Sequence, residues 1–102
     1  MRNTRKLNRV RRRFRVSLSG SSAFTIDVSP QGFCTEMLRI PPVGTPVQGS
    51  IRVKEAEYAF AGRVVWARPG DPRMNLRGRM GVSFTELPRS ATSPDPFAQA
   101  IQ

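Results

Sequence analysis

The sequence contains no histidine, and among its 102 residues it has a single cysteine, Cys34. Without histidine, the commonest general base and the commonest metal ligand are both missing. The seven acidic residues are scattered, and no pair has a spacing typical of acid–base catalysis. The composition therefore predicts a protein that is not an enzyme and that holds neither a metal nor a cofactor.

Long apolar runs are also missing. No run approaches the roughly 18 residues that a membrane-spanning helix needs, and no apolar stretch of the kind found in secretory signals follows the basic N-terminus. We therefore expect no membrane insertion. One cysteine allows no intramolecular disulfide, which fits a reducing compartment, and we expect a cytoplasmic protein. The length suits one compact domain.

Basic residues are concentrated at the start of the chain. Eight of the seventeen lysines and arginines lie in the first sixteen positions, and no acid accompanies them. Such an arm can hold phosphates or an anionic surface. The alternative for residues 1–7 is a solvated tail that only aids solubility, and the sequence leaves both interpretations open.

From Phe14 onward, apolar residues recur at every second position, which is the period of a half-buried β-strand. The alternating runs are residues 14–19, 24–29, 47–54, 58–67 and 79–84, and Gly32–Met37 adds a short strand. Turn residues separate the runs at 19–22, 29–32, 41–44 and 69–72. This pattern predicts an all-β antiparallel sandwich or small barrel.

The same alternation assigns individual side chains to a face. It predicts inward positions for the aromatic residues Phe14, Phe24, Phe60, Phe84 and Trp66. Cys34 is expected to be a small core residue. Residues 74–79 are interpreted as a solvated loop and strand edge. At the C-terminus, residues 88–94 are expected to form a loop, and Asp95-Pro96 can begin a short helix over Phe97–Ile101.

An arginine-rich stretch, residues 9–16, enters the first predicted strand. Arginine presents a planar fork that grips phosphate bidentately and also pairs with the O6 and N7 acceptors of guanine. Arg11 and Arg15 are four residues apart, so they lie on one side of either a helix or a strand. By itself this stretch is typical of many basic arms.

A second polar stretch, residues 27–32, ends the next predicted strand. The carboxylate of Asp27 can accept from guanine N1–H and from its exocyclic amine, with the Ser29 hydroxyl beside it. Alternation places both side chains on the face opposite Phe24. Gly32 allows a tight turn or a close backbone approach. The structural alternative is an ordinary Asx or Ser turn between two strands.

Together the two stretches resemble the signature of the PilZ domain family, Arg-x-x-x-Arg followed by Asp/Asn-x-Ser/Ala-x-x-Gly. The signature falls on Arg11, Arg15, Asp27, Ser29 and Gly32. Residues 63–66 and 80–84 resemble two late strands of the family. The resemblance covers residues 9–87 and leaves residues 1–8 as a flexible basic arm and residues 88–102 as a tail or short helix.

The arginine half of the signature departs from the family pattern at one position. Val10 stands where many members have a further arginine, and Arg12 or Arg9 can substitute for it. Arg9 and Arg13 also form a second Arg-x-x-x-Arg, although only Arg15 directly precedes the strand.

The resemblance implies a six-stranded antiparallel β-barrel with a site for cyclic di-GMP (c-di-GMP) on its outer surface. It implies that the arginines hold phosphates and guanine edges while Asp27 and Ser29 contact a guanine. It also implies a bacterial second-messenger receptor that acts on a protein target in motility or biofilm regulation. We expect the ligand to order the segment 9–15 and so to signal to that target.

Two other functions remain open. One is a nucleic-acid-binding β-barrel, which normally exposes aromatic side chains between its cations; the predicted inward positions of the phenylalanines argue against it. The other is a PilZ-like protein-interaction module that binds no nucleotide, against which the intact signature argues.

Overall fold

The structure is a computed structural model that describes residues 10–89. Three predictions lie outside the described residues: the basic arm at residues 1–8, the candidate binding residue Arg9, and the helix Phe97–Ile101.

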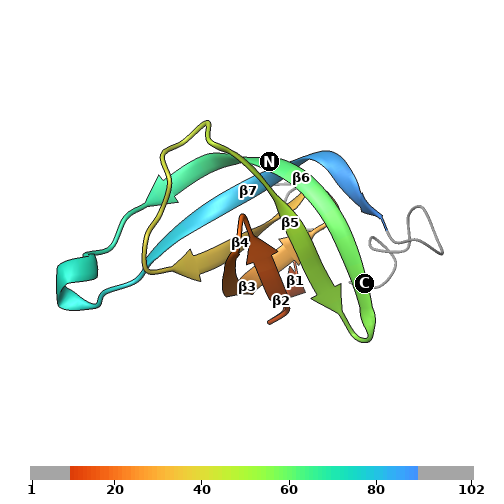
Figure 1. The fold of residues 1–102 in the computed structure, drawn as a ribbon, viewed down its shortest axis with the longest axis horizontal. Helices are drawn as coiled ribbons and strands as arrows, with labels where there is room; N and C mark the ends of the chain where they lie inside the picture. Colours follow the sequence, from red (N-terminus) through yellow and green to blue (C-terminus); the bar gives the residue numbers. More distant parts are fainter. Residues whose placement is uncertain (1–9, 90–102) are drawn as a thin grey trace, which may run out of the picture.

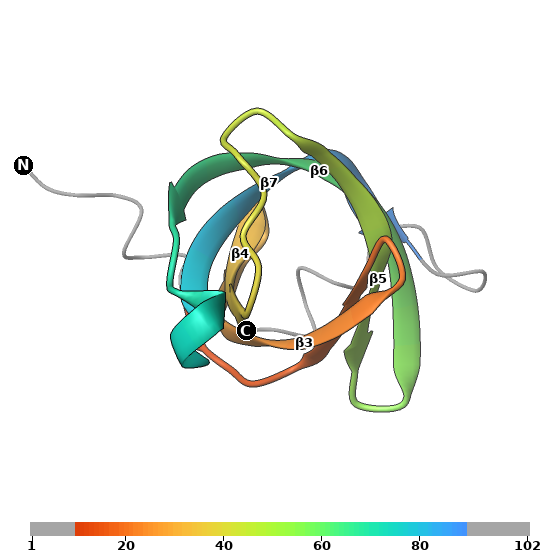
Figure 2. The same ribbon diagram turned by 60° about the vertical axis from the view of Figure 1, so that its left-hand side comes forward.

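Seven antiparallel strands form one sheet that curls into a barrel (Figures 1 and 2). They are β1 Val10–Arg11, β2 Arg15–Leu18, β3 Ser21–Ser29, β4 Gly32–Met37, β5 Pro46–Val53, β6 Ala56–Arg68 and β7 Gly78–Arg89, with a 3-10 turn, η1, at Pro72–Met74. The order is β1-β3-β2-β5-β6-β7-β4, and β3 also pairs with β4, which closes the ring. The predicted six-stranded antiparallel barrel is confirmed. The additional strand, β1, comes from the arginine-rich stretch at residues 9–16.

The barrel interior holds the apolar residues that alternation assigned to it. They come from β2, β5, the first part of β6, and β7: Val16, Leu18, Val47, Ile51, Val53, Tyr58, Phe60, Val64, Met80 and Val82. The Phe33 ring meets that of Phe60 edge-on, with centroids 5.4 Å apart, and lies 5.9 Å from that of Phe84. Burial of these side chains is the main force that holds the sheet closed.

Three strands depart from simple pairing: β7 is irregular opposite residues 59–62, and in β3 and β6 an extra residue changes which side chains face outward. In β3, Thr25 pairs with Thr35 and Asp27 with Cys34, so Ile26 has no partner of its own. In β6, Val64 pairs with Val82 and Trp66 with Gly81, so Val65 is the extra residue. Such a β-bulge reverses the faces of all residues on one side of it.

The bulges overturn two predictions. Phe24 and Trp66 were expected inside, but each is 38% exposed on the outside of the barrel. Thr25 is buried in place of Phe24. A third correction concerns the predicted loop at residues 88–94: β7 continues to Arg89, and Pro88 is buried.

The contact between β2 and β5 requires a glycine. Gly49 stands opposite Leu18, and a Cβ built there would lie 1.7 Å from the backbone oxygen of Ser17. Any side chain would force the two backbones apart.

We therefore predict that Gly49→Ala lowers the free energy of unfolding by about 3 kcal/mol, because overpacking at a backbone contact cannot relax by a rotamer change. Urea unfolding measures the loss. Gln48→Ala, at the exposed neighbouring position, is the control and should change stability by less than about 0.5 kcal/mol. Equal effects of the two substitutions would contradict the assigned contact.

Candidate functional site on the outer face of the barrel

A row of directly opposed residues crosses five strands on the outside of the barrel. Its members, from β1, β3, β4, β7 and β6, are Arg11, Asp27, Cys34, Gly81 and Trp66. Opposed residues in antiparallel strands point to the same side, with neighbours about 5 Å apart. We call this set the Asp27 row.

A second row lies two residues along β4, β6 and β7 from the first, and three residues along β3, where the bulge adds Ile26. It consists of Arg15, Phe24, Glu36, Arg79 and Arg68, from β2, β3, β4, β7 and β6. We call it the Phe24 row. Because residues two apart on a strand share a face, the two rows together make one surface, which we call the outer face.

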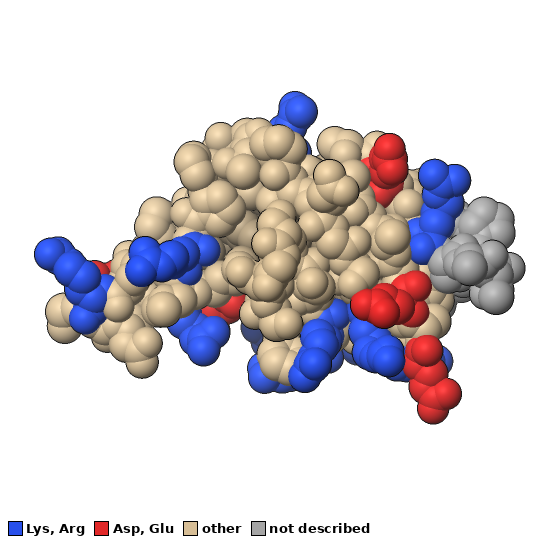
Figure 3. All heavy atoms as spheres, in the orientation of Figure 1, with Lys and Arg blue, Asp and Glu red and all other residues tan. Residues whose placement is uncertain are grey.

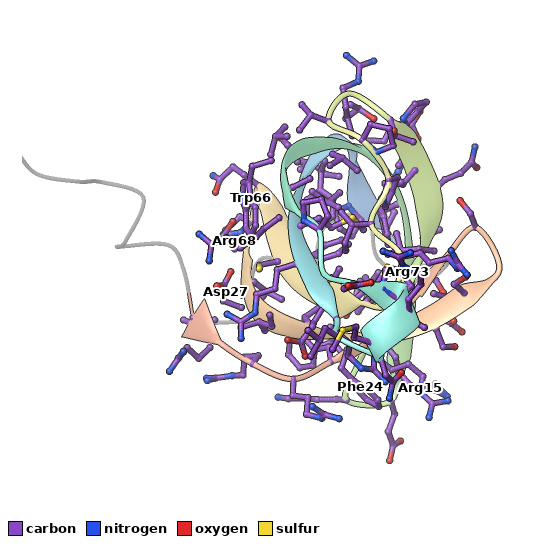
Figure 4. All side chains as sticks on the ribbon, turned by 90° about the vertical axis from the view of Figure 1, so that its left-hand side faces the viewer. Arg15, Phe24, Asp27, Trp66, Arg68 and Arg73 are labelled. Carbon is purple, nitrogen blue, oxygen red and sulfur yellow. The ribbon has the colours of Figure 1, made fainter. Side chains whose placement is uncertain are left out.

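The indole of Trp66 covers part of the Asp27 row. A Cβ built on Gly81 would lie 2.1 Å from Trp66 Nε1, so the ring occupies the space that a side chain at Gly81 would take. Cys34, the next member of the row, is small and buried. Figure 4 shows Trp66, Arg68 and Asp27 on the same side of the barrel. The row thus has a carboxylate and an indole, with only the small residues Cys34 and Gly81 between them.

The Phe24 ring is the centre of a second, cationic part of the outer face. The guanidinium carbon of Arg13 lies 4.0 Å from the ring centroid, and that of Arg15 lies 5.8 Å from it. A shallow groove of about 470 Å³ surrounds the ring, and Glu36 and Arg77 contribute to its walls. Glu36 accepts from Arg79 at 3.4 Å. Flat, electron-poor groups and anions both suit this groove.

Thr25 fixes the arginine-rich segment to the barrel. Its buried hydroxyl accepts from the amide of Phe14 at 2.9 Å and donates to the carbonyl of Arg12 at 2.8 Å. Its own amide donates to the carbonyl of Phe14 at 2.9 Å. Because the backbone is held at these points, Arg11 falls opposite Asp27 and Arg15 falls opposite Phe24.

Ser29 and Gly32 have structural contacts. The Ser29 hydroxyl donates to the Gly32 carbonyl at 3.4 Å and accepts from the Gln31 amide at 3.2 Å, as in the Ser turn that was the structural alternative. A Cβ on Gly32 would lie 1.9 Å from the carbonyl oxygen of Val82. The glycine therefore permits the close approach of β7, and a ligand contact of either residue stays a prediction.

The structure thus brings together part of the predicted site. Arg11 and Asp27 are direct partners, Arg15 lies in the neighbouring row, and Arg12 is exposed and donates to the carbonyl of Arg11. Asp27 and Phe24 share the outer face, which corrects the expectation that they point to opposite sides.

Sequence reasoning did not assign Phe24, Trp66, Glu36, Arg68 or Arg79 to the outer face, nor Arg77 to the groove beside it. The bulges hide the two aromatics from a periodicity argument, and Arg77 reaches the groove from a distant turn. No sequence signal marks these positions, because the pairing of Gly81 with Trp66 is known only from the strand register.

Two further observations concern the described residues. Within residues 10–89, no three His, Cys, Asp or Glu side chains gather in the manner of a metal site. No helix in the same part of the chain has the length and apolar character that crossing a membrane would need.

The fold is a small closed β-barrel whose outer face carries arginines, a carboxylate and two aromatic rings. A family model described as the PilZ domain matches residues 2–93. The chain therefore belongs to the PilZ domain family, whose members are binding and adaptor modules.

Among solved structures, the chain is similar to that of the Bacillus subtilis inhibitor of motility (MotI/DgrA), with a TM-score of 0.71 and 16% sequence identity. The match covers 92% of this chain and 46% of the other, so this chain spans less than half of that protein. At this identity the likeness shows the fold alone. No curated protein matches the chain.

We predict that Thr25→Val loosens the arginine-rich segment. Valine keeps the shape but leaves the Phe14 amide and the Arg12 carbonyl without their partner, which should lower the free energy of unfolding by about 2 kcal/mol. Amide hydrogen exchange at Val10 and Arg11 should become faster.

Thr85→Val, at an exposed position on β7, is the matched control and should change neither quantity. If Thr25→Val left the exchange of Val10 and Arg11 unchanged, the anchoring role of Thr25 would be wrong.

Proposed function

We propose that this chain is a receptor for c-di-GMP and that the ligand binds on the outer face. The observation that supports this most is the joining of the two rows, which gather a carboxylate, two aromatic rings and several arginines on one surface. A ligand with two phosphates and two guanines requires those three kinds of group.

The Asp27 row suits a guanine. The Asp27 carboxylate can accept from N1–H and from the exocyclic amine, two adjacent donors that adenine does not offer. Arg11, directly opposite, can pair with the Hoogsteen edge or with a phosphate. The Trp66 indole at the other end of the row offers a flat surface against which a base can stack.

The Phe24 row suits the remainder of the ligand. Arg13 already lies over the Phe24 ring, so a base can take its place there while the guanidinium moves to a phosphate. Arg15 and Arg77 line the same groove. Arginine is the residue type best suited to this role, because its fork binds phosphate oxygens bidentately.

Signalling would then proceed through the arginine-rich segment. Among the described residues, β1 pairs with β3 through Val10 and Arg11, so a contact at Arg11 bears directly on this pairing. A ligand held by both Arg11 and Asp27 would join the segment to the barrel and change the surface that a protein target meets. The target would be a component of motility or biofilm regulation.

A nucleic-acid-binding function is the second candidate, and one observation favours it. Phe24 and Trp66 are exposed among arginines, which removes the argument from inward aromatics. Asp27 favours the first proposal, because a carboxylate inside a cationic face repels a phosphate backbone and attracts a base with adjacent donors.

We predict tight binding of c-di-GMP in calorimetric titration at roughly physiological salt, and selectivity over cyclic di-AMP and GTP. Arg15→Ala and Asp27→Ala should each weaken it at least tenfold, because each removes a contact worth about 1–3 kcal/mol.

Arg39→Ala is the matched control, since Arg39 is exposed on the β4–β5 connection away from both rows. Affinity shared by every nucleotide and steeply reduced by salt would indicate a polyanion-binding barrel instead. The absence of any binding would leave a PilZ-like interaction module that takes no nucleotide.

The signalling step makes a separate prediction. Saturating c-di-GMP should slow amide hydrogen exchange at Val10 and Arg11, because the ligand would hold β1 against β3. The amides of β5, which is separated from β3 by β2 in the strand order, serve as the internal reference. Unchanged exchange across residues 1–16, in protein shown by calorimetry to be saturated, would remove this mechanism and leave the receptor proposal standing.

A further inference from the structure

The turn between β6 and β7, residues 69–77, projects at one end of the molecule (Figure 1, left). It is well ordered by its own hydrogen bonds. Asp71 and Leu76 exchange two backbone hydrogen bonds of 2.9 Å, and the amide of Met74 donates to the Asp71 carbonyl at 3.0 Å. Asn75 closes the turn with a left-handed backbone, φ 58°. We call this segment the β6–β7 tip.

The tip holds two apolar side chains out into solvent. Met74 is 68% exposed and Leu76 is 56% exposed. The bridge between Asp71 and Leu76 fixes their direction, so the exposure is built into the turn. Neighbouring apolar side chains that are exposed to solvent and surrounded by polar residues are typical of a contact surface.

The surroundings of the two apolar residues are strongly basic. Four arginines lie on or beside the tip: Arg68, Arg73, Arg77 and Arg79. The side chain of Arg73 is 94% exposed. Asp71 is the only acid between Glu57 and Glu86 in the sequence, and its carboxylate accepts from the amide of Arg73 at 3.1 Å. Figure 3 shows the basic side chains at this end of the molecule.

We propose that the β6–β7 tip docks on the surface of an anionic lipid bilayer. Met74 and Leu76 enter the boundary between head groups and acyl chains, and Arg73 pairs with lipid phosphates beside them. Burial of a few apolar side chains together with basic residues near the surface is the general basis of peripheral membrane binding. This contact needs no spanning segment, but it places two side chains in the bilayer interface and so departs from the expectation of no membrane insertion.

The shape of the tip favours a bilayer over a protein partner. A stable protein interface buries about 800 Å² on each side, with its apolar anchors at the centre of the patch. Here the two anchors stand at the end of a narrow turn with no broad surface around them. A bilayer needs only that the turn enter it. The basic residues at positions 1–9 supply a second attraction of the same sign.

The proposal goes beyond c-di-GMP binding and does not depend on it. Arg77 lines the Phe24 groove as well as the tip, so it is left unchanged in the tests. Met74, Leu76 and Arg73 do not line that groove, and variants of these residues separate the two functions.

The first test is flotation of the full chain with vesicles of phosphatidylcholine alone and of phosphatidylcholine with about 30% phosphatidylglycerol. We expect binding to the anionic vesicles only. Met74→Ser/Leu76→Ser should weaken it about tenfold or more, through loss of apolar burial, and Arg73→Gln should weaken it less. Val43→Ser is the matched control, because Val43 is 61% exposed on a different connection.

A second measurement reports the depth of the tip directly. Met74→Cys carries an environment-sensitive dye, and the native Cys34 is buried and shielded from labelling. We expect a blue shift of the dye on anionic vesicles and none for a dye on Val43→Cys. Thermal unfolding and c-di-GMP titration of each variant, unchanged from the parent, show that the fold and the outer face are intact.

Three outcomes would overturn the proposal. One is a lack of vesicle binding. Another is vesicle binding that Met74→Ser/Leu76→Ser leaves unchanged, which would assign the attraction to the basic arm alone. The last is dye emission at position 74 that does not shift on vesicles that bind the protein. This result would favour a protein partner for the tip.

Discussion

The outer face depends on the extra residue in each of two strands. In a closed barrel every strand has a neighbour on both sides, so each side chain has a fixed face, and one inserted residue reverses the faces beyond it. Ile26 reverses β3 so that Phe24 joins Asp27 outside. Val65 does the same in β6 for Trp66. Without these two bulges, both rings would belong to the core and the two rows would hold only charges and small residues.

This dependence explains how far sequence reasoning could go. The alternation around Val16 and Ile51 predicts strands and an interior because burial imposes period two on any half-buried strand. The residue types at Arg11 and Asp27 predict a chemistry because their functional groups are specific. A bulge has no residue type or spacing of its own in the sequence, because it exists only where two residues of one strand lie opposite one residue of its partner. Trp66 could be placed only once Gly81 was known to lie opposite it.

The signature residues divide into those that lie on the outer face and those whose contacts are within the barrel. Arg11, Arg15 and Asp27 lie in the two rows, whereas Gly32 admits the backbone of β7 and Ser29 closes the turn before it. Thr25, outside the signature, holds the arginine-rich segment in register. A motif treated only as a set of ligand contacts would overlook Thr25, although the position of Arg11 depends on it.

Charge alone would make this surface attractive to any polyanion, so selectivity requires an opposing element. Arg11, Arg13 and Arg15 raise the affinity for phosphate whatever it is attached to. In the proposed receptor, Asp27, directly opposite Arg11, would lower that affinity for every ligand that cannot give its carboxylate adjacent donors. Guanine can, and a phosphate backbone cannot. Specificity is a difference of affinities, and under the proposed function the single carboxylate of the Asp27 row would supply the difference that its arginines cannot.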